Sequence, residues 1–198
     1  MILDKIHKKF IYDNRIIQLY NNIKYLAKDS TFILDIGAGD GKLDKMLMDN
    51  TDLSIIGIDV LVRDTTYIPV LQYDGKHILR EDNSTNTTML IDVLHHTDNP
   101  EEVFKEVVRV TNKYIIIKDH IKTNTWSYIK LKLMDIVGNK SYGVSLPYNY
   151  LTKSEWQKLF KDNNLRVVKC KTNLHLYKGI CHKLFDSNLH FIALLEKV

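Results

Sequence analysis

Cysteine is scarce in this chain of 198 residues, which contains only Cys170 and Cys181. Two cysteines cannot build a disulfide framework or a cysteine-rich zinc site, and neither lies in a Cys-x-x-Cys pattern. We therefore interpret both as structural, predict no metal site, and expect a reducing environment such as the cytoplasm.

Long apolar runs are also missing. No run approaches the roughly 20 residues that a membrane-spanning helix needs, and the residues after Met1 become charged at once, without the apolar core of a signal peptide. Both observations favour a cytoplasmic protein with no membrane span. The formal net charge of +4 is small and no run of like charges forms a binding tail, so nucleic acid is not an expected partner.

Short apolar runs alternate with amphipathic helical patterns along the chain, which is typical of a single α/β domain, here residues 1–198. Pro69 suits the beginning of a strand and argues against a crossover helix before it. The expected strands are residues 32–36, 53–58, 70–73, 88–91, 114–117, 167–168 and 189–195, and the expected helices are residues 13–28, about 43–47, one opening at Asn99 and Pro100, and one opening with a capping box from Thr152 to Glu155.

Residues 121–150 do not fit a standard connection between two elements. The segment contains Trp126, Tyr128, Tyr142, Tyr148 and Tyr150, and residues 129–136 have a helical pattern. Connections of this length are usually functional, as lids or binding loops. We predict a substrate lid here, and a subdomain that serves only packing is the alternative.

Glycine is sparse too, yet three of the eight glycines lie within residues 33–41, whose sequence is ILDIGAGDG. Gly37, Gly39 and Gly41 fall on a turn between a buried strand and a helix. Glycine permits positive φ and lets a ligand approach the bare backbone, and the helix N-terminus favours a carboxylate nearby. The spacing is G-x-G-x-G, not the dinucleotide fingerprint, which requires glycine where Lys42 stands.

Acidic residues mark the ends of the next strands. Asp59 ends the second strand, about twenty residues after the turn, where a carboxylate can accept both hydroxyls of an adenosine ribose. Asp74 ends the third strand, Asp92 the fourth, and Asp119 with His120 the fifth. One such acid alone is typical of a cap or a turn. Because open α/β sheets bind ligands at the carboxyl ends of their strands, the series predicts a binding site.

With these residues the sequence resembles class I S-adenosylmethionine (SAM)-dependent methyltransferases of the broad type 11 small-molecule group. The resemblance covers nearly the whole chain after about residue 30 and rests on residues 34–41 (LDIGAGDG), 57–60 (GIDV), 73–75 (YDG) and 92–96 (DVLHH). It implies SAM as cofactor and a doubly wound, Rossmann-like sheet of seven strands, mostly parallel with an antiparallel last strand and a lid insertion after the fifth. Residues 117–120, 134–139 and 146–150 look like a bacterial-type subgroup with no settled substrate.

The resemblance implies roles at the methionine end of SAM. Asp35 and the backbone at Gly37 would hold this end, and Gly39 would let the cofactor lie against the turn. Asp92 and the residues after it would border the methyl group.

At the adenosine end, Asp59 would bind the ribose hydroxyls and Val60 would pack on the adenine. Asp74, followed by Gly75, would face the adenine amine. The sequence departs from the family pattern in its short crossover between strands two and three, which would leave the adenine pocket more open than usual. A second departure is the pair at residues 85–86 (TN), where relatives often carry Phe-Asp.

Histidines supply the candidate catalytic groups. His120 follows the fifth strand, whose carboxyl end should face the methyl group, and an imidazole can take a proton near neutral pH. We predict His120 as general base, with His95 as the second candidate. Relatives often carry histidine at the positions of His95 and His96 for packing, and a hydrogen bond to a backbone carbonyl is the alternative role for His120.

The function predicted from the sequence is transfer of a methyl group from SAM to a small-molecule acceptor, at oxygen or nitrogen. Methylation of RNA or protein is one alternative, although no Asn-Pro-Pro-Tyr-like tetrapeptide follows the fourth strand. A SAM-binding scaffold without catalysis is another. The identity of the acceptor and the oligomeric state stay open.

Overall fold

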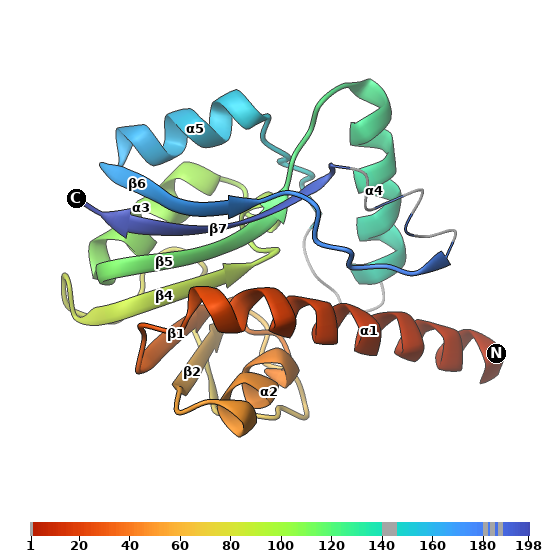
Figure 1. Cartoon of the computed structure of the whole chain (residues 1–198), viewed down its shortest axis with the longest axis horizontal. Coiled ribbons are helices and arrows are strands. Elements are labelled where there is room, and N and C mark those ends of the chain that lie inside the picture. Colours follow the sequence, from red (N-terminus) through yellow and green to blue (C-terminus); the bar gives the residue numbers. More distant parts are fainter. Residues whose placement is uncertain (1, 140–145, 180–181, 183–184, 186–187) are drawn as a thin grey trace.

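A computed structural model of the chain describes residues 2–139, 146–179, 182, 185 and 188–198. Their strands form one sheet in the order β3-β2-β1-β4-β5-β7-β6 (Figure 1). Strands β1 to β5 pair in parallel, whereas β7 is antiparallel to both β5 and β6. The strands are β1 (Phe32–Ile36), β2 (Ser54–Asp59), β3 (Val70–Gln72), β4 (Thr85–Ile91), β5 (Thr111–His120), β6 (Leu165–Lys171) and β7 (His190–Lys197). The predicted sheet, with its antiparallel last strand, is confirmed.

Helices cover both faces of this sheet, with α1 and α2 on one side and α3 and α5 on the other (Figure 1). Asn99 accepts a hydrogen bond from the Glu102 amide at the start of α3, and the predicted capping box opens α5. No helix in the described residues is long and apolar enough to cross a membrane. The helices are α1 (Ile2–Leu26), α2 (Lys42–Asn50), the short 3-10 helix η1 (Leu94–His96), α3 (Pro100–Val110), α4 (Thr125–Asn139) and α5 (Lys153–Asp162).

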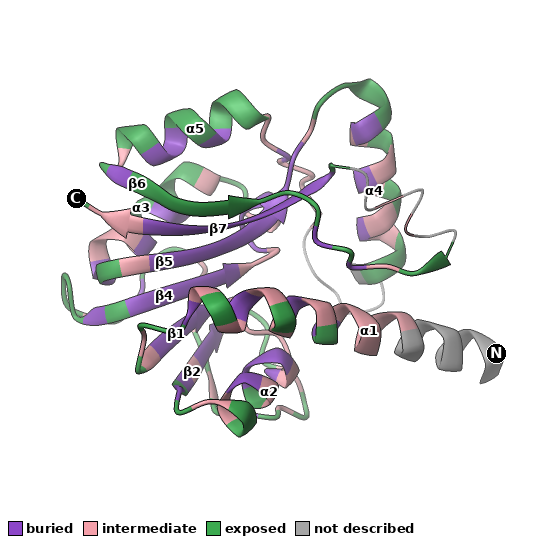
Figure 2. Cartoon of the chain, viewed as in Figure 1, coloured by how far each residue is buried: buried purple, intermediate pink, exposed green. Residues whose placement is uncertain are grey.

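Each central strand contributes to two hydrophobic cores, because successive side chains point to opposite faces of a sheet. Leu34 and Ile117 join the core beneath α3 and α5, whereas Ile33 and Ile116 join the core beneath α1 and α2. All four are completely buried, and the central strands are almost entirely buried in Figure 2. Burial on both faces fixes the register of the strands, and therefore the position of their carboxyl ends.

The carboxyl ends of the parallel strands meet at one edge of the sheet, called the carboxyl edge below. Helix α4 stands beyond this edge, and the N-terminal half of α1 runs out past it (Figure 1). Leu131 of α4 packs there on Tyr150 and Leu189. The described part of the predicted lid segment therefore lies at the carboxyl edge, and Tyr142 falls outside the described residues.

Several element boundaries differ from those expected. Helix α1 begins at Ile2, not at residue 13, and α4 extends over Thr125–Asn139. Strand β4 begins at Thr85 and β5 covers Thr111–His120, because buried threonine, lysine and aspartate side chains continue the strands beyond their apolar centres. Residues 60–69 form no helix, as Pro69 and the short spacing predict.

Helix α2 places a carboxyl group, Asp44, against Asp35 of β1 inside the protein. Both residues are nearly inaccessible, and neither Asp44 oxygen nor Asp35 Oδ1 has a hydrogen-bond partner within the described residues. Burial raises the pKa of Asp44 to about 7. Burial and then the neighbouring Asp44 raise the pKa of Asp35 well above its usual value. The pair is thus most stable when it holds a proton.

We predict that Asp44→Asn makes the protein more resistant to unfolding at pH 8 than the wild type, with a smaller difference near pH 4. A carboxyl whose pKa is raised on folding stabilises the fold below its unfolded pKa of about 3.9 and loses that contribution as pH rises through its folded pKa, here about 7. A gain of about 1 kcal/mol would raise the melting temperature by about 2–4 °C. Thermal melts from pH 4 to 8 test this, with the exposed Asp49→Asn of the same helix as control. A difference that does not change with pH would contradict the prediction.

Candidate active site

The glycine-rich turn follows β1 directly and lies against the chain after β4. The Gly37 amide donates to the Ile58 carbonyl at 2.8 Å, and a Cβ at Gly37 would come 2.5 Å from a Val93 methyl carbon. Gly39 has φ +61° and nothing within 4 Å of an added Cβ. Gly37 therefore allows close packing, whereas Gly39 keeps bare backbone next to open space that a ligand can occupy.

Asp59, at the end of β2, is anchored by two backbone amides. Its Oδ2 accepts from Gly39 at 2.8 Å and its Oδ1 accepts from Leu61 at 2.9 Å. The carboxylate is therefore fixed beside the turn, and its remaining lone pairs can accept ribose hydroxyls. The ribose role that the resemblance implies for Asp59 stays a prediction.

The β3 side of the site is open and apolar. Val60 is 53% exposed, and a Cβ at Gly75, which has φ +81°, would come 2.9 Å from Val60 Cγ1. Asp74 accepts from the Lys76 and His77 amides at 2.7 Å each and from the His77 ring at 2.9 Å. These hydrogen bonds lower the pKa of Asp74 to about 2. Asp74 is thus an ionised carboxylate fixed by its own turn, beside an exposed valine that could pack on adenine.

Asp92, at the end of β4, lies between two cations. Its carboxylate forms ion pairs with Arg15 of α1 and Lys118 of β5. Burial works to raise its pKa, but Lys118 and Arg15 outweigh burial and hold the pKa of Asp92 well below its usual range. Asp92 also has φ +59°, an uncommon conformation for aspartate that re-aims the chain toward η1.

Helix α1 contacts the same region at two further points. Tyr12 donates to Asp40 Oδ1 at 2.8 Å, and Lys42 forms an ion pair with Asp13. Together with the pair between Arg15 and Asp92, these contacts hold α1 over the glycine-rich turn.

The two candidate catalytic histidines lie side by side, with ring centroids 4.4 Å apart. His95 Nδ1 and Asp119 Oδ1 are 2.6 Å apart. His120 Nε2 is 3.7 Å from Asp92 Oδ1 and 3.8 Å from Asp135 Oδ1. Asp135 comes from α4, and its Oδ2 is 3.5 Å from His95 Nε2. We call His95, Asp119, His120 and Asp135 the histidine–carboxylate cluster.

The cluster is buried, with each of its four members at most 4% exposed. Tyr150 donates a hydrogen bond to Asp135, and Trp156 Nε1 donates to the His120 carbonyl at 2.9 Å. Four segments thus supply one polar group of side chains at the carboxyl edge: η1, the end of β5, α4 and residue 150.

The environment shifts the pKa values of His95 and His120 in opposite directions. Burial opposes the charged form of His95, but Asp119 and Asp135 outweigh it and raise the pKa of His95 to about 10. Burial, then His95 and Lys118, lower the pKa of His120 well below its usual value. Burial and His95 lower the pKa of His96 to about 4. The cluster therefore attracts positive charge at one position, between His95 and the carboxylates.

The structure brings the predicted residues into two groups. Gly39 and Asp59 meet at the turn, with Val60, Asp74 and Gly75 on its β3 side, whereas Asp92, His95 and His120 meet at the carboxyl edge. Asp35 differs, because it is buried against Asp44. The roles of all these residues stay predictions.

Sequence reasoning did not single out several residues that the structure places in the site. Lys118, Asp135 and Tyr150 lie in the segments that look like the bacterial-type subgroup, and that resemblance could have pointed to them. Tyr150 was named only as an aromatic residue of the expected lid. Arg15 and His190 carry no such signal, because their partners are 77 and 70–72 residues away in the sequence.

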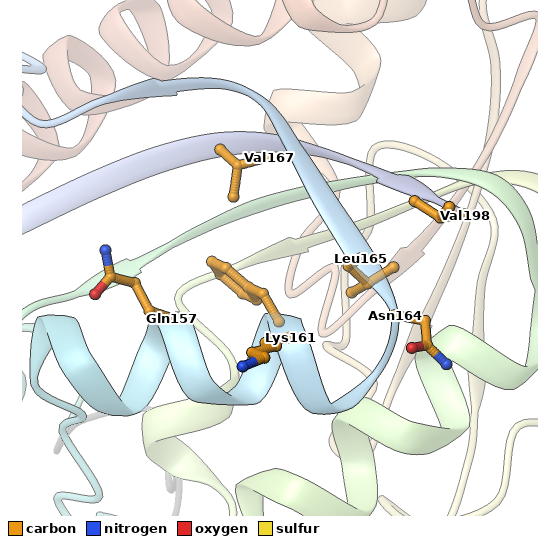
Figure 3. Close-up of a pocket in the computed structure, with 7 residues that line it drawn as sticks. Gln157, Lys161, Asn164, Leu165, Val167 and Val198 are labelled. Carbon is orange, nitrogen blue, oxygen red and sulfur yellow. The ribbon is translucent and has the colours of Figure 1, made fainter.

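Two surface hollows lie elsewhere. One, of about 380 Å³, is lined by residues of α5 and β6 and by Val198 (Figure 3). It includes Leu165, which begins β6, so it is at the end of the sheet opposite the carboxyl edge. The other, of about 610 Å³, lies between residues 77–81 and α3. Neither contains a residue of the cluster.

Comparison with known proteins places this geometry in context. Residues 34–115 match a family model described as a methyltransferase domain. This match includes the glycine-rich turn, Asp59, Asp74, Asp92 and His95. A search of curated proteins finds no match.

Solved structures share the fold over nearly the whole chain. The PH0226 protein from Pyrococcus horikoshii is 17% identical, with a TM-score of 0.69 and coverage of 94% of this chain and 91% of that one. A chain in the complex of the Haloferax volcanii Trm112 methyltransferase activator with a methyltransferase is 11% identical, with a TM-score of 0.63 and 96% coverage of both chains.

A third similar structure is magnesium protoporphyrin IX methyltransferase from Synechocystis with bound S-adenosylhomocysteine (SAH). It is 12% identical, with a TM-score of 0.58 and coverage of 97% of this chain and 84% of that one. The domain match over residues 34–115, the strand order and the glycine-rich turn agree with one another, and the chain is similar in fold to SAM-dependent methyltransferases.

Proposed function

We propose that this chain is a class I SAM-dependent methyltransferase, and that it methylates a hydroxyl group of a small molecule that binds between the carboxyl edge and α4. The observation that supports this most strongly is the histidine–carboxylate cluster beside Asp92. Gly37 of the glycine-rich turn is packed on Val93, two residues before His95. The glycine-rich turn and the cluster are therefore neighbours.

The chemistry needs positioning and one proton transfer. The acceptor oxygen forms a bond to the methyl carbon as the bond from that carbon to sulfur breaks, which leaves SAH. Alignment of the reactants supplies most of the acceleration in such a displacement. A neutral hydroxyl is a weak nucleophile, and its proton must leave. We propose His120, whose lowered pKa keeps its ring neutral, as the group that accepts this proton. His95 is the second candidate, and its raised pKa means that it would first have to lose its own proton.

The lid supports the same assignment. Asp135, a member of the cluster, and Tyr150, which donates a hydrogen bond to it, both belong to residues 121–150. If α4 covers the acceptor, its residues complete the site on closure and exclude water. We therefore propose that residues 121–150 form a substrate lid and not a subdomain that serves only packing.

We predict that Asp59→Ala weakens SAH binding by about 30- to 1000-fold. Hydrogen bonds to a charged acceptor contribute about 1.5–3 kcal/mol each, and a loss of roughly 2–4 kcal/mol corresponds to this range. Calorimetry on the variant measures it, with the exposed Asp49→Ala as control. Unchanged affinity would refute the ribose assignment.

We predict that His120→Ala lowers turnover by roughly 10²–10⁴-fold and leaves SAH affinity nearly unchanged, because the ring acts on the acceptor. Release of SAH from labelled SAM, with an extract of small metabolites as the acceptor source, gives the turnover. The exposed His175→Ala is the matched control. A loss below about tenfold would mean that His120 does not activate the acceptor, and a large loss of SAH affinity would place it in the cofactor pocket.

We predict that the amides of α4 exchange hydrogen more slowly when SAH and the metabolite fraction that accepts the label are both present. The reason is that a bound acceptor would be enclosed between α4 and the cluster. Hydrogen exchange of peptides from residues 125–139, with α5 as internal reference, tests this. Equal exchange with and without ligands would count against a lid.

A further inference from the structure

We propose that His95, His120 and Asp135 form a binding site for a divalent transition-metal ion, with Asp92 at its edge, and that the ion binds the acceptor oxygen. The metal site itself stands on the geometry of the cluster. Its contact with the acceptor rests on the proposed function.

The distances suit a metal ion. One ligand atom from each of Asp92, His95 and His120 lies within 4.8 Å of the others, and the same holds for His95, His96 and Asp135. Asp135 joins the two rings through its two oxygens, because His95 Nε2 lies 3.5 Å from Oδ2 and His120 Nε2 lies 3.8 Å from Oδ1. Ligands about 2.0–2.2 Å from a zinc-like ion lie roughly 3–3.5 Å apart, so small side-chain movements suffice.

The hydrogen bonds of His190 assign a lone pair to His120 Nε2. The Phe185 carbonyl, 3.0 Å from His190 Nε2, can only accept, so His190 Nε2 carries hydrogen. In neutral His190, Nδ1 then accepts, and it lies 3.2 Å from Lys118 Nζ and 3.0 Å from His120 Nδ1. His120 consequently donates from Nδ1, and in its neutral form Nε2 faces Asp92 and Asp135 as a lone pair.

His95 is oriented in the same manner. Its Nδ1 donates to Asp119, and its Nε2 is buried with no hydrogen-bond partner among the described residues. A neutral His95 would thus aim a second lone pair toward Asp135. Two lone pairs and a carboxylate that converge in a buried place repel one another unless a cation lies between them.

Charge favours a cation at this point. Among the described residues, three carboxylates, Asp92, Asp119 and Asp135, face two permanent cations, Arg15 and Lys118. A metal ion held by two neutral imidazoles and Asp135 would supply the missing positive charge.

Each ligand is held by another residue, as is usual for metal-binding histidines and carboxylates. Asp119 orients His95, His190 orients His120, and Tyr150 hydrogen-bonds Asp135. Two imidazoles and one carboxylate favour zinc, iron or cobalt over magnesium or calcium, which prefer oxygen ligands.

Three protein ligands leave a position for the acceptor. A metal-bound hydroxyl loses its proton more readily, so the bound oxygen would attack the methyl carbon as an alkoxide or phenolate. The proton would leave to solvent when the acceptor binds. The methyl group would then pass to the acceptor oxygen, and the electron pair of the broken carbon–sulfur bond would stay on the sulfur of SAH. In this account both histidines act through the ion.

Titration of Co²⁺ into chelator-treated protein tests the site, followed by visible absorption and by calorimetry. We expect one ion per chain with nitrogen- and oxygen-ligand absorption bands. Asp135→Asn and His120→Gln should each weaken binding by about 100-fold or more, because loss of an outer partner alone costs about 10–100-fold. Asp119→Asn should weaken Co²⁺ binding by about 10–100-fold, because Asp119 is such an outer partner. The exposed His175→Gln should bind Co²⁺ as the wild type does.

Retained SAH binding shows that each variant is folded. Absence of stoichiometric Co²⁺ binding, or equal affinity in Asp135→Asn and wild type, would overturn the metal proposal. If the metal-free enzyme still transfers label, the proposed function stands and His120 acts as a plain base. If Co²⁺ and SAH bind but no small molecule accepts label, the metal site stands and the proposed function fails.

Discussion

The carboxylate of Asp119 connects the end of β5 to the chain that follows β4. It accepts hydrogen bonds from the Leu94 amide at 3.1 Å, the His120 amide at 2.7 Å and the His95 ring at 2.6 Å. A buried carboxylate is tolerated only when it is paired in this way. Because Asp119 binds the ring of His95 and the backbone amide of His120, a change at this residue should disturb both candidate histidines. The parallel register of β4 and β5, fixed by burial on both faces, brings these groups within reach.

Two helices approach the carboxyl edge, and each is tied to one part of the site. Helix α1 contacts the glycine-rich turn through Tyr12 and Asp13 and reaches Asp92 through Arg15. Helix α4 contributes Asp135 to the cluster. Asp92 lies between the two parts, paired with Arg15 on one side and with Lys118 on the other. A change of charge near the glycine-rich turn should therefore change the electrostatic potential at the cluster, since buried ion pairs are only weakly screened.

Much of the fold and the position of the glycine-rich turn could be predicted from the sequence, because local patterns encode them. The glycine spacing, the capping box of α5 and the apolar centres of the strands are features of a few neighbouring residues. The sequence placed Asp119 and His120 at the end of the fifth strand but did not extend the strand through Lys118, Asp119 and His120, since these residues are buried yet have the composition of a loop. Their burial depends on partners distant in sequence, such as His190.

The same limit applies to the cluster. The sequence supplied His95 and His120 from the ends of strands, but Asp135 lies on a helix whose position no local pattern fixes. Cysteine count alone suggested that metal binding was absent. Two histidines and a carboxylate from three separate segments form a candidate site only after the chain has folded.

The most direct test of the account is to find which molecules receive the methyl group. The enzyme would be incubated with isotope-labelled SAM and a cell extract separated into small-molecule, RNA and protein fractions, and the products analysed by mass spectrometry. The account predicts label on a hydroxyl oxygen of a small molecule with the wild type, and almost none with His120→Ala. Label in the RNA or protein fraction, or no label anywhere while SAH still binds, would contradict it.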